Sequence, residues 1–158
     1  MTRSPADHVV RVISNADDLD LLVTQINDAS WDDANEMSVY SVNALEAYLE
    51  RQDTVFLACH ESSPASKLLG IASGRLELKP YEKVRWLYVD EVDVCADERQ
   101  RGVGRCLMNA LLALAEENDC EELWLGTEAD NHAANALYRS LEPDDIAEVV
   151  GYTFEFDD

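Results

Sequence analysis

The sequence predicts an α/β protein, a single domain over residues 1–158 with a mixed central β-sheet and helices on both faces. The 158 residues fall within the size of one domain, and no repeat or linker-like stretch divides them. Short runs of apolar and β-branched residues alternate with segments whose apolar residues recur at helical spacing. The resulting order, β-α-α-β-β-β-α-β-α-β, is typical of a mixed sheet with helices packed against it.

The first half of the chain predicts one strand, two helices and two further strands. β-Branched residues favour the first strand, and Ser, Asn and Asp side chains favour helix starts. The expected elements are a strand at 9–13, a helix after a cap at Asn15 or Asp17, a second helix after Ser41, and strands at 54–59 and 68–78.

The second half predicts strands and helices that alternate. A break at 79–83, which contains Pro80, ends the preceding strand and turns the chain back. The expected elements are a long strand at about 84–95, a helix at 102–118, a strand at 122–126, a short helix at about 132–141, and a closing strand at 151–156.

The charge of the chain excludes one class of partner. The sequence has 12 Lys and Arg against 33 Asp and Glu, and its formal net charge is −21. Nucleic-acid binding needs clustered cations, so no nucleic-acid partner is expected. Two explanations of the acidity stay open. The surface either attracts polycationic acceptors by long-range steering or reflects a salty habitat.

Membrane and metal partners are not expected either. No apolar run approaches the ~20 residues of a membrane span, and the first residues lack a secretory core, so a cytoplasmic protein is expected. The four cysteines have no Cys-x-x-Cys spacing and the three histidines are scattered. The sequence therefore predicts free thiols and no metal site.

A strand-loop-helix segment carries the strongest chemical signal. Val92-Asp93-Val94 ends a strand, and Arg99-Gln100-Arg101-Gly102-Val103-Gly104-Arg105 opens the next helix. The first turn of a helix has backbone N–H groups without internal partners and lies at the positive end of the helix dipole. Two glycines allow a bulky anion to approach these amides, and the arginines around them suit a pyrophosphate.

A second motif, Asn131-His132-Ala133-Ala134-Asn135-Ala136-Leu137-Tyr138-Arg139-Ser140-Leu141, follows about thirty residues later. Together, Arg-x-x-Gly-x-Gly and Asn-x-x-Ala-x-x-Leu-Tyr-x-x-Leu resemble the paired acetyl-CoA motifs of the GNAT superfamily of N-acetyltransferases. The resemblance covers roughly residues 68–141. The segment at 78–85, the long strand at 87–94 and the terminal Phe154-Glu155-Phe156-Asp157 are similar to the type I aminoglycoside 3-N-acetyltransferases. The chain departs from that family at position 142, where Glu142 replaces the usual glycine and Pro143 follows it, and over a longer 142–151 segment.

The resemblance implies acetyl-CoA as co-substrate and a set of residues that hold it. The amides of 99–105 would bind the pyrophosphate, and the main chain of the preceding strand would pair with the pantetheine arm. Asn131 is a coenzyme-side contact or simply a helix N-cap. The implied coenzyme set is Val92, Asp93, Val94, Arg99, Gln100, Arg101, Gly102, Val103, Gly104, Arg105, Asn131, Ala134 and Tyr138.

The resemblance also implies two catalytic residues, each with an alternative. Tyr138 would be the general acid that protonates the departing thiolate, or a packed helix tyrosine. Glu91 would be the base that takes a proton from the acceptor ammonium. Asp90 and Asp93 are rivals for that role, because a bulge would change which face each side chain occupies.

The expected acceptor is a primary amine of a polycationic small molecule, and the resemblance implies the 3-amino group of an aminoglycoside. Asp90, Glu91, Glu128 and Asp130 are the candidate acceptor-binding acids. A polyamine or a protein N-terminus is an alternative acceptor, and a non-catalytic acetyl-CoA sensor is an alternative function. A homodimer is also expected from the resemblance.

Overall fold

The computed structural model describes residues 8–31, 37–98 and 101–157. The chain divides into two compact units, residues 1–125 and 126–158. Among the described residues, the first unit contains the β-sheet and three α-helices. The second contains one α-helix and the C-terminal segment.

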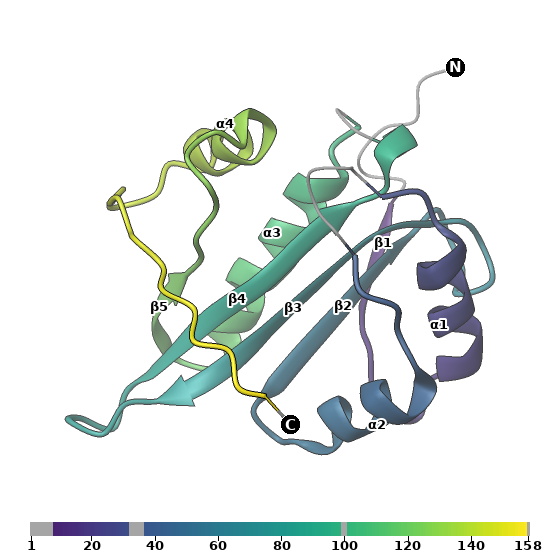
Figure 1. Ribbon diagram of the computed structural model, residues 1–158, viewed down its shortest axis with the longest axis horizontal. Helices are drawn as coiled ribbons and strands as arrows, with labels where there is room; N and C mark the ends of the chain where they lie inside the picture. Colours follow the sequence, from purple (N-terminus) through teal and green to yellow (C-terminus); the bar gives the residue numbers. More distant parts are fainter. Residues whose placement is uncertain (1–7, 32–36, 99–100, 158) are drawn as a thin grey trace. The chain divides into compact units, whose positions relative to one another are not determined.

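A five-stranded mixed sheet forms the first unit (Figure 1). Its strands lie in the order of the sequence, and neighbouring strands are antiparallel except for β4 and β5, which are parallel. The strands are β1 (Val9–Val12), β2 (Thr54–His60), β3 (Leu68–Leu78), β4 (Arg85–Val94) and β5 (Cys120–Trp124). The parallel pair is made possible by the long helix that connects β4 to β5.

Helices cover both faces of this sheet. One face packs against α1 (Leu19–Asp28) and α2 (Val42–Glu50), whose apolar residues join Phe56, Ala58 and Ile71 in one core cluster. The other face packs against α3 (Val103–Glu117). A Cβ atom built on Gly70 would lie 3.0 Å from Val103 Cγ1 and 3.1 Å from Leu107 Cδ1, so α3 approaches β3 closely there.

The helix starts follow the capping rules. Ser41 accepts a hydrogen bond from the amide of Ala44, as predicted for the start of α2. The cap of α1 is Asp18, which accepts from the amide of Leu21. The predicted caps Asn15 and Asp17 are therefore wrong. Asp17 instead accepts from the amide of Ser14 and closes the preceding turn.

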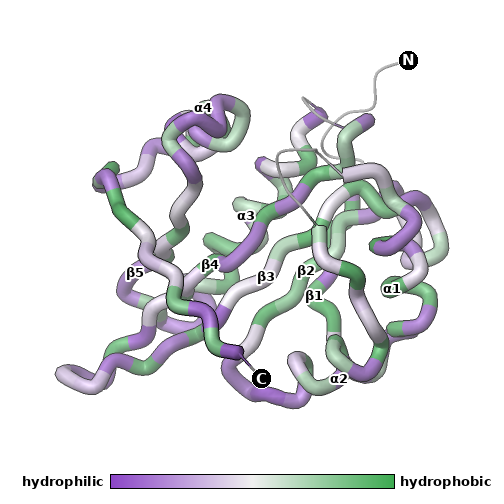
Figure 2. The backbone as a smooth tube through the Cα atoms, in the orientation of Figure 1, coloured by the Kyte–Doolittle hydropathy of each residue, from purple (hydrophilic) through white to green (hydrophobic). Residues whose placement is uncertain are grey.

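The middle of the sheet is almost entirely apolar. Figure 2 shows hydrophobic stretches along β2 and β3, and every residue from Val55 to His60 is buried. The alternate residues of β2 pack against opposite faces, so a strand covered on both sides has a continuous apolar sequence. This explains why the 54–59 run indicated a central strand.

The second unit contains α4 (His132–Ser140) and lacks the predicted closing strand. No strand is assigned between residues 141 and 157, and Tyr152, Phe154 and Phe156 are 79–90% exposed. The alternation of aromatic and polar residues satisfied the side-chain pattern of a strand. A strand also needs a neighbour for its backbone groups, and this segment pairs with none in the part of the chain that the structure describes.

Where the sequence predicts both ends of an element, the other elements agree with the structure to within two residues at each end. The largest shift is at β5, which begins at Cys120, whereas the prediction placed it at 122–126. Within the described ranges, no helix is both long enough and apolar enough to cross a membrane.

Candidate active site

The first turn of α3 carries backbone amides that have no carbonyl acceptor within the helix. Gly102 is the N-cap in the left-handed conformation, with φ 82° and ψ 9°, and no side chain caps the helix. Its carbonyl accepts the first helical hydrogen bond, from the amide of Cys106. The amides of residues 103–105 precede that bond and therefore have no acceptor within the helix. The positive end of the dipole and the glycines suit a phosphate group here.

The predicted cations around this turn are only partly described. Arg99 and Gln100 lie outside the described residues. Arg101 and Arg105 are both exposed, and Arg101 lies 3.4 Å from the carboxylate of Glu98. The structure therefore places two of the three predicted arginines at the helix start.

The outer edge of β4 is open beside this turn. β5 pairs with β4 only over residues 85–88. Within the described ranges, no strand pairs with the outer edge of 89–94, the segment that contains Val92, Asp93 and Val94. Its other edge pairs with β3, where Val92 lies opposite Ala72 and Val94 opposite Gly70. An extended ligand arm can thus pair with the main chain at this edge, as the coenzyme prediction requires.

A β-bulge decides where the strand acids point. Ser73 lies opposite Glu91 but Gly74 lies opposite Val89, so Asp90 is an extra residue in β4. Because of this extra residue, Glu91 and Asp93 share the face of Ser73 and Ile71, which is the face covered by α1 and α2. Gly74 is required at the bulge, since a Cβ atom there would lie 2.7 Å from the carbonyl oxygen of Tyr88.

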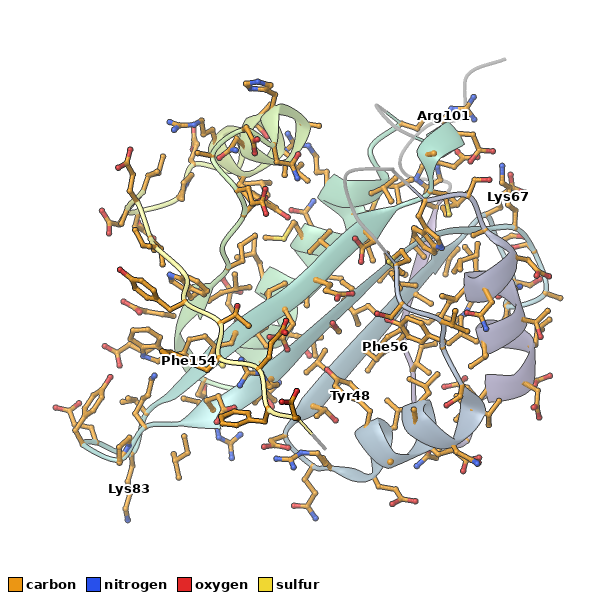
Figure 3. The ribbon with its side chains drawn as sticks, viewed as in Figure 1. Tyr48, Phe56, Lys67, Lys83, Arg101 and Phe154 are labelled. Atoms are coloured by element: carbon orange, nitrogen blue, oxygen red, sulfur yellow. The ribbon has the colours of Figure 1, made fainter. Side chains whose placement is uncertain are left out.

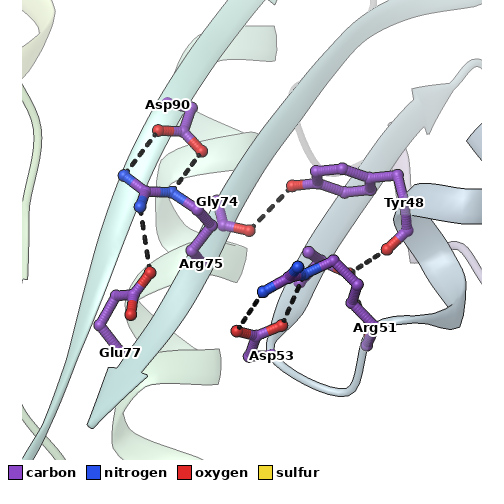
Figure 4. A network of polar contacts seen from close by, with 8 residues as sticks. Tyr48, Arg51, Asp53, Gly74, Arg75, Glu77 and Asp90 are labelled. Atoms are coloured by element: carbon purple, nitrogen blue, oxygen red, sulfur yellow. Dashed lines mark hydrogen bonds and ion pairs between the residues drawn. The ribbon is translucent and has the colours of Figure 1, made fainter.

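The three rival acids have different surroundings. Both carboxylate oxygens of Asp90 accept from Arg75, at 3.1 and 3.2 Å, and Arg75 also contacts Glu77 at 3.0 Å (Figure 4). Asp93 is buried, with only 6% of its surface exposed. Glu91 is exposed and lines a cavity on the α2 side of the sheet. It is therefore the acid best placed to meet an acceptor.

This cavity has a volume of about 280 Å³ and lies between α2, the segment before it and the sheet. Its lining residues are Ser38, Val39, Tyr40, Ser41, Ala44, Leu45, Tyr48, Phe56, Ser73 and Glu91. Three of them are aromatic, and the rings of Tyr40 and Tyr48 meet Phe56 edge to face, with centroids 6.2 and 6.3 Å apart. Figure 3 shows Tyr48 and Phe56 on the side of the sheet that carries α2.

The tyrosines of the cavity stay protonated. Burial, and then the charges of Glu91 and Asp93, raise the pKa of Tyr40 to about 12. The hydroxyl of Tyr48 lies within hydrogen-bond distance of the carbonyls of Val55, at 3.1 Å, and Gly74, at 2.9 Å. Tyr48 thus connects α2 to the bulge (Figure 4). The negative potential that acts on Tyr40 is one in which an ammonium group is favoured.

Sequence reasoning missed most of this cavity. The two motifs and the strand acids directed attention elsewhere, and neither Tyr40 nor Tyr48 is among the predicted site residues. The one available signal was Ser73, a polar residue directly after the apolar run 68–72. The cavity is formed by residues from four separate segments, so no local sequence motif indicates it.

The remaining predicted residues belong to the second unit. Asn131 is the N-cap of α4, and its side chain accepts from the amide of Ala134 at 3.2 Å. Its alternative role as a helix cap is therefore confirmed. Tyr138 lies half-buried on α4, and Glu128 and Asp130 are exposed in the preceding loop. Among the described residues, no group of three or more His, Cys, Asp or Glu side chains could hold a metal ion.

Comparisons with known proteins agree with the fold. The model of the acetyltransferase (GNAT) family matches residues 22–142, so the chain belongs to that family and is an acetyltransferase. No curated protein sequence matches the chain significantly.

Solved structures share the fold at low sequence identity. An aminoglycoside acetyltransferase, meta-AAC0020, from an uncultured soil metagenomic sample in complex with trehalose is 17% identical, with a TM-score of 0.81 over 96% of this chain and 98% of that one. Its complex with sisomicin has a TM-score of 0.79 at 16% identity, over 96% and 98% of the two chains. The ribosomal-protein-alanine N-acetyltransferase of Brucella melitensis biovar Abortus 2308 has a TM-score of 0.71 at 18% identity, over 94% and 99%.

Proposed function

We propose that this acetyltransferase moves the acetyl group of acetyl-CoA to a primary amine of a polycationic small molecule, with an aminoglycoside as the first acceptor class. The observation that carries the proposal is the position of Glu91. This carboxylate lies on the strand whose open edge adjoins the amide-rich start of α3, and it lines a cavity large enough for part of an acceptor.

The start of α3 supports acetyl-CoA as co-substrate. The first-turn amides after Gly102 suit the pyrophosphate, and the main chain of 89–94 suits the pantetheine arm. When bound, acetyl-CoA supplies an activated thioester. The first-turn amides of α3 and the main chain of 89–94 would hold it.

The cavity supports an amine acceptor. An ammonium group is attracted to the carboxylate of Glu91 and to the faces of aromatic rings. Only the neutral amine attacks a carbonyl, so Glu91 takes a proton from the ammonium, directly or through water. The role of Tyr138 as the acid that donates a proton to the departing thiolate rests on its place in the second motif.

The choice of a polycationic acceptor is supported by fewer observations than the acetyl transfer itself. The structures named above include two complexes of an aminoglycoside acetyltransferase, one of them with sisomicin, but the identities of 16–17% make this an argument about fold. The ion pair with Arg75 occupies Asp90, so Glu91 is the main acid for the reacting amine. Glu128 and Asp130 stay candidates for binding further amines on the sequence prediction alone.

A panel assay tests the proposal. Free-thiol release from acetyl-CoA is measured with sisomicin, spermidine and a peptide carrying a free N-terminal alanine. We expect turnover with an amine acceptor and the highest kcat/KM with the aminoglycoside. Preference for spermidine or the peptide would overturn the acceptor class, and absence of acetyl-CoA binding would overturn the coenzyme assignment.

The coenzyme side has its own test. A folded Gly104→Val variant places a branched side chain in the first turn of α3, where a phosphate would approach. We expect weaker binding of acetyl-CoA, measured by calorimetry. Unchanged affinity would remove the pyrophosphate from this turn.

A further inference from the structure

Glu98 is a buried carboxylate just before the start of α3. It ends the short 3₁₀ turn Ala96–Glu98, and only 3% of its side chain is exposed. Lys67 Nζ lies 2.9 Å from one carboxylate oxygen and Arg101 Nη1 lies 3.4 Å from the other. Glu98 thus connects two cations at one end of the sheet, where Figure 3 shows Lys67 and Arg101.

Burying the carboxylate of Glu98 is energetically unfavourable by itself. Removing a carboxylate from water is unfavourable unless cations and hydrogen bonds compensate it. Its negative charge also lies close to the turn proposed to bind a pyrophosphate, so on charge alone it opposes coenzyme binding. The compensation comes from Lys67 and Arg101.

The backbone fixes both sides of this cluster. On one side, the carbonyl of Lys67 accepts from the amide of Glu61 and anchors Lys67 in the β2–β3 turn. On the other, the amide of Glu98 donates to the carbonyl of Cys95, and the amide of Cys95 donates to the carbonyl of Leu69. The Glu98 carboxylate is therefore held in a fixed position relative to β3.

Arg101 links this fixed carboxylate to the helix. It directly precedes Gly102, whose left-handed conformation sets the direction of the chain as it enters α3. The second contact of Lys67, to Asp97 at 2.7 Å, keeps the lysine at the cluster. The carboxylates of Asp97 and Glu98 raise the pKa of Lys67, which stays charged across the physiological range.

We propose that Glu98 is a positioning residue for coenzyme binding, which holds Lys67 and Arg101 together and orients the first turn of α3 before acetyl-CoA arrives. This inference rests on the proposed coenzyme site at α3. It adds two residues, Lys67 and Glu98, that neither motif contains.

The direction in which Glu98→Gln changes the Kd for acetyl-CoA distinguishes a positioning role from a purely electrostatic one. If Glu98 contributes only a negative charge, Glu98→Gln removes a repulsion and strengthens the binding of acetyl-CoA. If Glu98 positions the turn, the same change releases Arg101 and Lys67 and weakens binding. Because hydrogen bonds to charged groups are among the stronger ones, we expect Kd for acetyl-CoA to rise about tenfold.

The experiment compares acetyl-CoA binding by calorimetry in the unaltered protein, Glu98→Gln, Glu98→Asp and the control Asp53→Asn. Asp53 is also a carboxylate paired with an arginine, Arg51 at 3.2 Å, but it lies in an exposed turn. The control removes the same charge, and we expect its Kd to match that of the unaltered protein. We expect kcat at saturating acetyl-CoA to stay unchanged in Glu98→Gln while KM for acetyl-CoA rises.

The outcomes are distinguishable. Equal or tighter acetyl-CoA binding by folded Glu98→Gln overturns the positioning role. If Glu98→Gln does not fold, Glu98→Asp decides, because it keeps the charge and shortens the reach. We expect a raised Kd for that variant, and an unchanged Kd overturns the proposal. If the unaltered protein does not bind acetyl-CoA, it is the proposed function that fails.

Discussion

Glu91 lies opposite Ser73 in the β3–β4 ladder, whereas Val89, only two positions earlier, lies opposite the very next residue, Gly74. The extra residue, Asp90, rotates the rest of β4 so that Glu91 faces the cavity. Without the bulge, the alternation of a strand would place Glu91 and Val89 on the same face.

This relationship predicts different effects for two neighbouring acids. Glu91→Gln should lower kcat on the order of 10²-fold, because it removes the proposed base. Asp90→Asn weakens the half-exposed pair with Arg75 and should change the free energy of unfolding by under about 1 kcal/mol. Steady-state kinetics and urea unfolding check both variants. A larger loss of kcat in Asp90→Asn would assign the base to Asp90.

The left-handed Gly102 predicts a conformational effect on stability. A branched side chain is strained at φ 82°, so Gly102→Val should lower the free energy of unfolding by about 1–2 kcal/mol and weaken acetyl-CoA binding. Gly102→Asn is the matched control, since asparagine tolerates this conformation. Equal stability of the Val and Asn variants in urea unfolding would contradict this explanation.

The proposed role of Tyr138 predicts that its replacement lowers kcat without weakening acetyl-CoA binding. Tyr138→Phe removes the phenol that is proposed to protonate the thiolate. We expect kcat to fall on the order of 10²-fold with little change in Kd for acetyl-CoA. Wild-type kcat for the Phe variant across the pH range would make Tyr138 a packing residue of α4.

Two buried thiols predict a loss of stability at alkaline pH. Burial raises the pKa of Cys59 and Cys95 from 9.0 to about 12. Below pH 9 both thiols are neutral in the folded and unfolded chain. Between pH 9 and pH 12 they ionise only when unfolded, so the free energy of unfolding falls as pH rises.

Urea unfolding at pH 8, 9 and 10 measures this dependence. A Cys59→Ala/Cys95→Ala variant should be less stable at every pH, because it loses buried atoms, but its stability should fall less steeply. Identical slopes for the two proteins would show that these thiols do not cause the alkaline loss.

The acidity of the chain predicts a salt effect that depends on the ligand. If acids near the acceptor act together, added salt should raise KM for a polycationic acceptor, since exposed charges are screened over about 8–10 Å. KM for acetyl-CoA should change less or in a different pattern. A flat acceptor KM with stability that rises in salt would favour the salty-habitat explanation.

The sequence by itself determined the order of strands and helices up to α4 and the two motifs of the family. Both depend on local signals. The run at 55–59 is apolar because both faces of β2 are covered, and the caps and glycines act within a few residues of their positions. The same local reasoning failed for 151–156, whose pattern suits a strand but which pairs with no strand among the described residues.

Tertiary structure decided which acid enters the cavity and what surrounds it. The candidates Asp90, Glu91 and Asp93 are close to equivalent in the sequence. They differ because Asp90 is the inserted residue of a bulge, Arg75 from the next strand binds it, and burial encloses Asp93. Lys67 and Glu98 are likewise 31 residues apart and meet only when β3 and the turn before α3 come together. Contacts of this kind follow from strand register and packing, which depend on the whole fold and leave no local pattern to interpret.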